Sequence, residues 1–151
     1  MARKLLLNIT KSQEQLPSSL FIAGIHNVDK HPTFAGGFAD VYRAMLGKNH
    51  VALKRLRVFT SATQSRGKFC REAVIWKNLR HRFILPFLGV DRVTFSPFLC
   101  MVSPWMKNGT ILKYLSESAR GRAEVLQLLL EIAQGLEYLH SVNIVHGDLR
   151  G

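Results

Sequence analysis

A chain of 151 residues is long enough for one domain with a hydrophobic core and too short to expect two. Hydrophobic residues make up 47% of it and charged residues 21%, which is typical of a globular protein and excludes a disordered one. The net charge of +11 suggests an anionic partner, but the basic residues are scattered, without interleaved aromatic residues and without a finger or helix-turn-helix motif. We therefore expect a basic, solvated surface and no nucleic-acid site.

The sequence lacks the signals of a membrane or secreted protein. No apolar run approaches the roughly 20 residues of a membrane-spanning helix. The N-terminal segment MARKLLLNIT has a basic start, but its apolar run is shorter than the roughly seven residues of a signal-peptide core. We expect a cytoplasmic protein that does not associate with membranes. In that compartment Cys70 and Cys100 are predicted to be packing residues and not a disulfide.

The first firm pattern along the chain is a hairpin. Residues 1–30 show no clear periodicity and are interpreted as an N-terminal extension. Two segments rich in β-branched and aromatic residues follow, 38–46 and 50–58, and Gly47-Lys48-Asn49 between them predicts a tight turn.

A helix is predicted next. Ser61 and Gln64 fit a capping box at its start. Helical spacing then places four residues on one face: Phe69, Glu72, Trp76 and Leu79.

The rest of the chain begins with strands and continues with helices. Two strand-like runs, 84–93 and 98–103, are joined by a turn near Ser96-Pro97. A short helix, a long helix with an apolar stripe of 3.6-residue period, and a short strand are predicted over residues 111–115, 122–140 and 143–145. Because strands and helices are segregated and do not alternate, the sequence predicts an α+β fold.

Lys54 is the first candidate for chemistry. It follows Val51-Ala52-Leu53 in a predicted strand, where alternation directs Ala52 and Lys54 to the same side. A lysine directed inward needs a counter-charge, and Glu72 lies on an otherwise apolar helix face. These two residues predict an ion pair of the kind that grips a phosphate. The alternative is that both side chains extend to solvent.

Two further segments carry possible function. Gly36 and Gly37 precede a strand, and glycines there let backbone N–H groups approach a phosphate; alone, such a pair is equally typical of a turn. Asp148 follows the predicted short strand in a loop, where it could accept a proton from a hydroxyl or simply lie in a surface turn. His140, His146 and Asp148 could also be imagined as metal ligands, but a closed zinc site takes four ligands, and we expect no metal site in this chain.

Taken in order, these segments resemble the protein kinase family, whose signature set is a Gly-rich loop, Val-Ala-Ile-Lys, a helix glutamate and His-Arg-Asp-Leu. The similarity begins near residue 31 and continues to the end of the chain. It is closest to tyrosine-kinase-like Ser/Thr kinases, especially fungal members with a His-Gly-Asp loop. The segments that carry it are Gly36 to Val41, Val51-Ala52-Leu53-Lys54, Arg71-Glu72, Leu79 to Gly89, Met101 to Gly109, Gly135 to His140 and His146-Gly147-Asp148-Leu149.

The resemblance implies a fold and a domain organisation. We expect a kinase N-terminal lobe, with an antiparallel sheet and one regulatory helix, over residues 31–106 including the hinge, and a partial, helical C-terminal lobe over residues 107–151.

The resemblance also implies roles for individual residues. Lys54 would contact the α- and β-phosphates of ATP and Glu72 would hold Lys54, while Gly36 and Gly37 would cover the phosphates. Asp148 would orient the substrate hydroxyl and accept its proton. Adenine would lie between Val41 and Ala52, its edge would meet backbone groups of Pro104, Trp105 and Met106, Ser103 would control access behind it, and Arg150 would contact the transferred phosphate.

Three residues depart from the family pattern. Phe34 and Ala39 replace the first and third glycines of the loop, and the bulk of Phe34 puts its tight conformation in question. Gly147 replaces the arginine of His-Arg-Asp, so control by a phosphorylated activation loop is not expected.

The ligands that the family uses for Mg²⁺, the Asn five residues after the catalytic Asp and the Asp-Phe-Gly segment, would lie beyond residue 151. We therefore predict a protein kinase acting on a protein substrate with ATP and Mg²⁺, Ser/Thr favoured over Tyr, whose 151-residue chain alone has little activity. The alternative is a kinase-like binding module that regulates a partner kinase.

Overall fold

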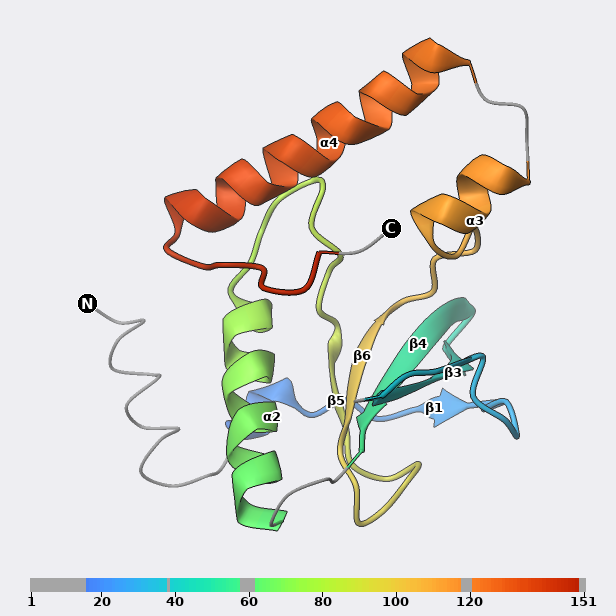
Figure 1. The fold of residues 1–151 in the computed structure, drawn as a ribbon. Helices are drawn as coiled ribbons and strands as arrows, with labels where there is room; N and C mark the ends of the chain where they lie inside the picture. Colours follow the sequence, from blue (N-terminus) through green and yellow to red (C-terminus); the bar gives the residue numbers. More distant parts are fainter. Residues whose placement is uncertain (1–15, 38, 58–61, 118–120, 150–151) are drawn as a thin grey trace. The chain divides into compact units, whose positions relative to one another are not determined.

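The computed structural model consists of two compact units, Met1–Leu79 with Pro86–Trp105 and Arg80–Leu85 with Met106–Gly151 (Figure 1). Among the described residues, the first unit contains the sheet, one α-helix and a 3₁₀ helix, and the second contains two α-helices, which is the expected α+β class. The residues that the structure describes are 16–37, 39–57, 62–117 and 121–149.

The centre of the first unit is the predicted hairpin. Strand β3 (Ala39–Leu46) pairs antiparallel with β4 (Asn49–Leu56), and Leu46 lies opposite Asn49, so Gly47 and Lys48 alone form the turn. Gly47 has φ +60°, a left-handed conformation that glycine adopts at little cost. Turn chemistry therefore sets the register of the two central strands.

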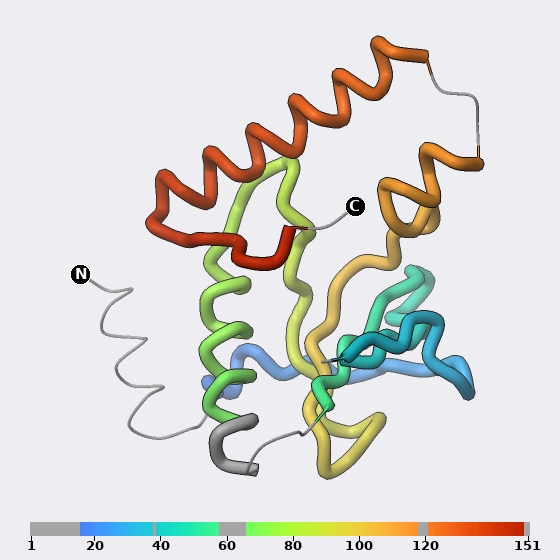
Figure 2. The backbone as a smooth tube through the Cα atoms, in the orientation of Figure 1, coloured from blue at the N-terminus to red at the C-terminus, as the bar shows by residue number. Residues whose placement is uncertain are grey.

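Four short strands complete an antiparallel sheet in the order β1-β3-β4-β6-β5, with β2 also paired to β3. The strand expected over 84–93 forms only at Gly89–Asp91, because Pro86 cannot donate to a ladder and the preceding residues turn, with Ile84 N–H donating to the His81 carbonyl. The bounds of the four strands are Ile25–His26 (β1), Phe34–Ala35 (β2), Gly89–Asp91 (β5) and Cys100–Pro104 (β6). The predicted turn near Ser96-Pro97 lies in the loop that joins the last two, coloured yellow in Figure 2.

Helix α2 (Ala62–Lys77), the helix predicted after the hairpin, covers one face of this sheet. Ser61 of the predicted capping box lies outside the described residues. Strand alternation separates two buried clusters: Met101 of β6 packs with the helix, whereas its neighbours Cys100 and Val102 pack on the other face. The helix-side cluster is Leu20, Phe69, Ala73, Val74, Phe87, Val90 and Met101; the second is Tyr42, Ala44, Val51, Leu53, Cys100 and Val102.

Residues 18–26, within the expected N-terminal extension, are part of the first unit. A 3₁₀ helix at Ser18–Leu20 buries Leu20, and Ile22 N–H donates to the Val90 carbonyl at 3.0 Å, along the edge strand β5. A Cβ at Gly89 would lie 2.9 Å from the Leu20 carbonyl oxygen, so the segment approaches the sheet closely. Periodicity did not indicate this packing because each contact involves only one or two residues.

The cysteines are buried thiols, as predicted. Burial, and after it the neighbouring Asp91 carboxylate, raises the pKa of the Cys100 thiol to about 12. A thiol with so high a pKa is not a nucleophile at neutral pH.

The second unit contains the two predicted helices, α3 (Ile111–Ser116) and α4 (Arg122–Ser141). The Thr110 hydroxyl caps α3 by accepting from Lys113 N–H. Residues 80–85 belong to this unit: Tyr138 of α4 accepts from Arg80 N–H at 2.8 Å, and the His81 ring stacks on Tyr138 with centroids 4.9 Å apart.

The strand expected over 143–145 does not form. Ile144 N–H instead donates to the Leu139 carbonyl at 2.9 Å, and Asn143 has φ +58°. These groups close the C-terminal end of α4, so a helix cap forms in place of the strand that the β-branched residues Ile144 and Val145 predicted. Along α4, Leu139 is buried, whereas Leu126, Leu129 and Leu130 are each more than half exposed.

Candidate functional site

Lys54 lies on a central strand, on the face of the sheet that α2 covers. Val41 and Met101 lie directly opposite it on the strands to either side, so the three side chains form one row on that face. Ala52 and Ser103 form the next row. Four of the residues expected around a nucleotide, Val41, Ala52, Lys54 and Ser103, therefore share one surface of the first unit.

The structure brings Lys54 and Glu72 together, with Nζ and Oε1 2.6 Å apart. The helix positions Glu72 because Phe69 and Ala73, on the same side of α2, are buried against the sheet. The side chains of Lys54 and Glu72 remain 36% and 41% exposed. A pair so exposed contributes at most about 1 kcal/mol to stability, so its main effect is to orient the ammonium.

The two glycines lie at the tip of the β2–β3 hairpin. Gly36 N–H donates to the Ala39 carbonyl at 2.9 Å, and a Cβ at Gly37 would meet nothing within 4 Å. Phe34, at the position of the first glycine, is a strand residue paired with Val41. Its ring lies 6.3 Å from that of Trp105, with a 32° angle between the planes, so the hairpin accommodates the bulky side chain.

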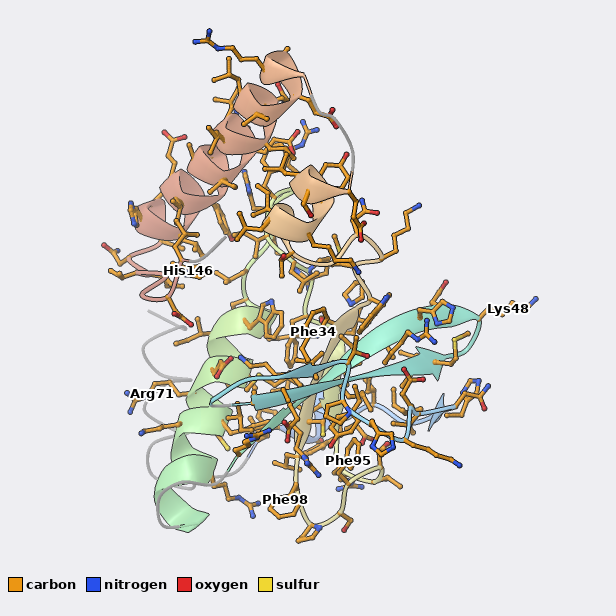
Figure 3. The ribbon with its side chains drawn as sticks, turned by 45° about the vertical axis from the view of Figure 1, so that its right-hand side comes forward. Phe34, Lys48, Arg71, Phe95, Phe98 and His146 are labelled. Atoms are coloured by element: carbon orange, nitrogen blue, oxygen red, sulfur yellow. The ribbon has the colours of Figure 1, made fainter. Side chains whose placement is uncertain are left out.

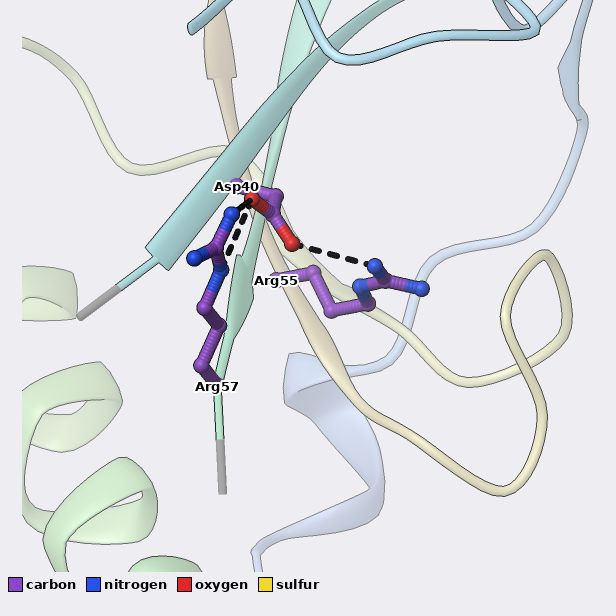
Figure 4. Close-up of polar contacts among 3 residues, drawn as sticks. All are labelled: Asp40, Arg55 and Arg57. Carbon is purple, nitrogen blue, oxygen red and sulfur yellow. Dashed lines mark hydrogen bonds and ion pairs between the residues drawn. The ribbon is translucent and has the colours of Figure 1, made fainter. Parts of the chain in front are cut away.

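An acidic centre that the sequence analysis missed lies on β3 at Asp40, which is opposite Ala35 of β2 and Arg55 of β4 (Figure 4). Asp40 is 4% exposed; its carboxylate accepts from Arg57 Nη2 at 2.6 Å and Nε at 3.0 Å, and from Arg55 Nη2 at 3.0 Å. The Arg55 guanidinium also lies over the rings of Tyr42 and Phe95, about 5 Å from each centroid. Hydrogen bonds from Arg57, and then from Arg55, lower the pKa of the Asp40 carboxyl below its ordinary value of 3.8. The sequence contained one signal for this cluster: in the predicted hairpin, the acidic residue Asp40 lies opposite the basic residue Arg55.

The segment after β6 carries the remaining nucleotide candidates. Ser103 is buried, and Trp105 N–H donates to the His50 carbonyl at 3.1 Å, which extends the β4–β6 pairing by one step. Met106, which is 59% exposed, belongs to the second unit.

Asp148 lies in a loop of the second unit and is exposed. Its N–H donates to His146 Nδ1 at 3.3 Å, and Gly147 between them has φ +74°. That left-handed conformation favours glycine, the residue that stands here in place of the family's arginine. Arg150 lies outside the described residues.

The described residues contain neither a cluster of metal ligands nor a membrane-spanning helix. Among those residues, no group of three or more His, Cys, Asp or Glu side chains could hold a metal ion. Within the same part of the chain, no helix is long and apolar enough to cross a membrane.

An antiparallel sheet with a lysine on a central strand, paired to a glutamate on the helix that covers it, defines the class of protein kinase N-terminal lobes. The family model described as protein tyrosine and serine/threonine kinase matches residues 32–151. The chain belongs to this family.

Three relatives illustrate the breadth of the match. The chain is 28% identical over 122 residues to serine/threonine-protein kinase STY46 of Arabidopsis thaliana, which covers 80% of this chain and 21% of the relative. It is 35% identical over 119 residues to tyrosine-protein kinase SPK-1 of Girardia tigrina, and the match covers 76% of this chain and 23% of the relative. It is 29% identical over 123 residues to serine/threonine/tyrosine-protein kinase HT1 of Arabidopsis thaliana, and the match covers 77% of this chain and 31% of the relative. The chain thus spans less than a third of each.

The Asp40 cluster predicts a specific response to acid. Asp40→Asn leaves two guanidinium groups without their counter-charge, and should reduce the free energy of unfolding at pH 7 by about 1–3 kcal/mol. Because the folded pKa of Asp40 is lowered, its stabilisation is present above the unfolded value of 3.8 and is lost as the pH falls towards the folded value. Urea unfolding at pH 7 and below pH 4 should therefore show the difference between wild type and variant narrowing in acid.

The matched control is Asp29→Asn, which removes a carboxylate 3.5 Å from the Arg43 guanidinium in a pair whose side chains are 39% and 47% exposed. This substitution should reduce the free energy of unfolding at pH 7 by less than about 1 kcal/mol. Equal losses for the two variants at pH 7 would contradict a structural role for the Asp40 cluster.

Proposed function

We propose that this chain is the nucleotide-binding part of a protein kinase that transfers the γ-phosphoryl group of ATP to a protein hydroxyl, with Ser/Thr favoured over Tyr. The observation that carries the proposal is the 2.6 Å contact between Lys54 and Glu72. In protein kinases such a pair holds the lysine for the nucleotide phosphates.

The chemistry of the pair suits an anionic ligand. An ammonium group has three N–H donors, so with one directed to Glu72 the others can reach phosphate oxygens. The partial exposure of both side chains leaves room for a ligand, whereas a fully buried pair would not. Gly36 and Gly37 would offer backbone N–H groups to the same phosphates.

The base would occupy the apolar surface beside Lys54, between Val41 and Ala52, with Ser103 behind it. Because Trp105 N–H already meets the His50 carbonyl, we assign contacts with the base edge to the other backbone groups of Pro104, Trp105 and Met106.

Asp148 is proposed as the residue that orients the substrate hydroxyl and accepts its proton, and Arg150 as a contact for the transferred phosphoryl group. Mg²⁺ would neutralise the phosphate charge; the ligands that the family uses for it are not among residues 1–151. A cytoplasmic location and membership of a fungal branch stay predictions.

A specific observation favours a second function. Phe34 and Ala39 replace two of the three loop glycines, and Phe34 is held as a strand residue. A kinase-like chain that binds nucleotide weakly would serve as a binding module, for instance as a regulator of an intact kinase.

Nucleotide binding tests the first proposal. Lys54→Met should weaken ATP binding by at least about tenfold, because a single charged hydrogen bond of about 1.5–3 kcal/mol is lost. Isothermal titration calorimetry of the 151-residue chain measures this. The control is Lys48→Met, which removes the same group at the tip of the hairpin (Figure 3) and should leave affinity unchanged. Equal affinities for wild type and Lys54→Met would refute the role of Lys54.

Phosphotransfer separates the enzyme from the binding module. Asp148→Asn should reduce kcat by at least about a hundredfold, as expected for loss of a catalytic base, in a chain extended to include the metal-binding segment. Incorporation of phosphate from labelled ATP into a generic protein substrate is the measurement. An extended wild-type chain that binds ATP but transfers no phosphate would favour the binding module. Full activity of Asp148→Asn would refute the role of that aspartate.

A further inference from the structure

Phe34 is the least expected side chain near the proposed nucleotide surface. It is an aromatic residue where the family has a glycine, and it is 42% exposed. Its position is fixed from both sides: Thr33 N–H donates to the Val41 carbonyl at 2.9 Å, and Gly36 N–H donates to the Ala39 carbonyl at 2.9 Å. Strand pairing therefore fixes the backbone of Phe34, so the side chain extends from a paired strand and not from an unpaired loop.

The register decides which face of the sheet Phe34 occupies. Phe34 lies opposite Val41, and Val41 lies opposite Lys54. Directly opposed residues of antiparallel strands share a face, so the Phe34 side chain is on the same surface as Lys54.

Trp105 reaches this surface from the opposite direction. Its pairing with His50 continues the β4–β6 register, and strand alternation puts it on the same side as Ser103. Along β4, Ala52 lies between the positions of His50 and Lys54. The two aromatic rings therefore approach each other from either side of the row that contains Ala52.

The geometry of the two rings leaves apolar surface available. Their centroids are 6.3 Å apart and their planes are tilted by 32°, an aromatic contact but not a close parallel stack. Phe34 is 42% exposed, so part of this residue faces solvent, and the register puts Ala52 in the row between the rows of Phe34 and Trp105. A flat heteroaromatic group seated over Ala52 would cover that surface.

We infer that Phe34, backed by Trp105, stacks on the base of the bound nucleotide and makes the site depend on the base as well as on the phosphates. A glycine at this position would let the backbone approach the nucleotide closely. Phe34 instead contacts the nucleotide through its side chain. The inference rests on the proposed nucleotide binding and names a specificity-determining residue of the same site.

Tryptophan fluorescence provides a direct test. The chain has two tryptophans, so in a Trp76→Phe background the emission reports on Trp105 alone. Adenosine, ATP and inorganic tripolyphosphate are titrated separately. Adenosine and ATP should change the emission of Trp105, and Phe34→Ala should weaken the binding of both by about fivefold or more, as expected for the loss of one base–aromatic stack. Binding of tripolyphosphate should not change.

Two matched variants separate stacking from simple apolar contact. Phe34→Tyr keeps the ring and should bind adenosine like the wild type, whereas Phe34→Leu keeps much of the volume without a ring and should behave like Phe34→Ala. Circular dichroism checks that all four chains are folded. Wild-type affinity for adenosine in Phe34→Leu would overturn the stacking role.

The outcomes also separate this inference from the proposed function. If the wild-type chain binds ATP and Phe34→Ala binds adenosine equally or more tightly, the inference is overturned and the proposed function stands. If the wild-type chain binds neither ATP nor adenosine, both are overturned.

Discussion

The ammonium of Lys54 and the carboxylate of Glu72, 2.6 Å apart, connect a central strand of the sheet to the helix that covers it. That contact depends on the apolar packing around it. Phe69, Ala73 and Val74 fix the rotation of α2 against the sheet, and this rotation presents Glu72 to β4. Because both charged side chains remain partly exposed, the pair adds little to stability and is suited to orienting a cation for a ligand. The hydrophobic core thus provides most of the stability of the first unit, and it also fixes the positions of the two charged groups.

The cluster of Asp40, Arg55 and Arg57 differs from the Lys54–Glu72 pair, because its charges contribute to stability and are not available to a ligand. Its carboxylate is almost fully buried and accepts three hydrogen bonds from two arginines, so its charge is met within the protein. Asp40 and Lys54 lie on adjacent strands, one residue out of step, and so face opposite sides of the sheet. One hairpin therefore carries a structural charge cluster on one side and a ligand-facing charge on the other. Strand alternation alone is enough to separate them.

The parts of the fold that rest on local chemistry were predictable from the sequence. The β3–β4 hairpin followed from its turn residues, α2 and α4 followed from helical periodicity, and the Lys54–Glu72 contact followed from two charges on otherwise apolar faces. The errors have a common cause. The run 84–93 and the segment 143–145 are rich in apolar residues, which indicate burial but do not decide between a strand and a turn. Pro86 and the helix cap at Ile144 prevented a strand there. The packing of Leu20 at the sheet edge joins segments far apart in the chain and had no periodic signal, whereas the contacts of Asp40 with its arginines could have been found from the register of the predicted hairpin.

The central claim is that Glu72 acts on the nucleotide only through Lys54, and a double-mutant cycle on ATP affinity tests it most directly. Calorimetry would compare the wild type with Glu72→Gln, Lys54→Met and the double variant, with Glu137→Gln on the exposed side of α4 as control. Residues that act as a unit give a coupling energy of about 0.5–3 kcal/mol. We expect Glu72→Gln to weaken ATP binding in the wild type and to have no further effect once Lys54 is methionine. Fully additive losses would show that the two residues act independently and would contradict the account.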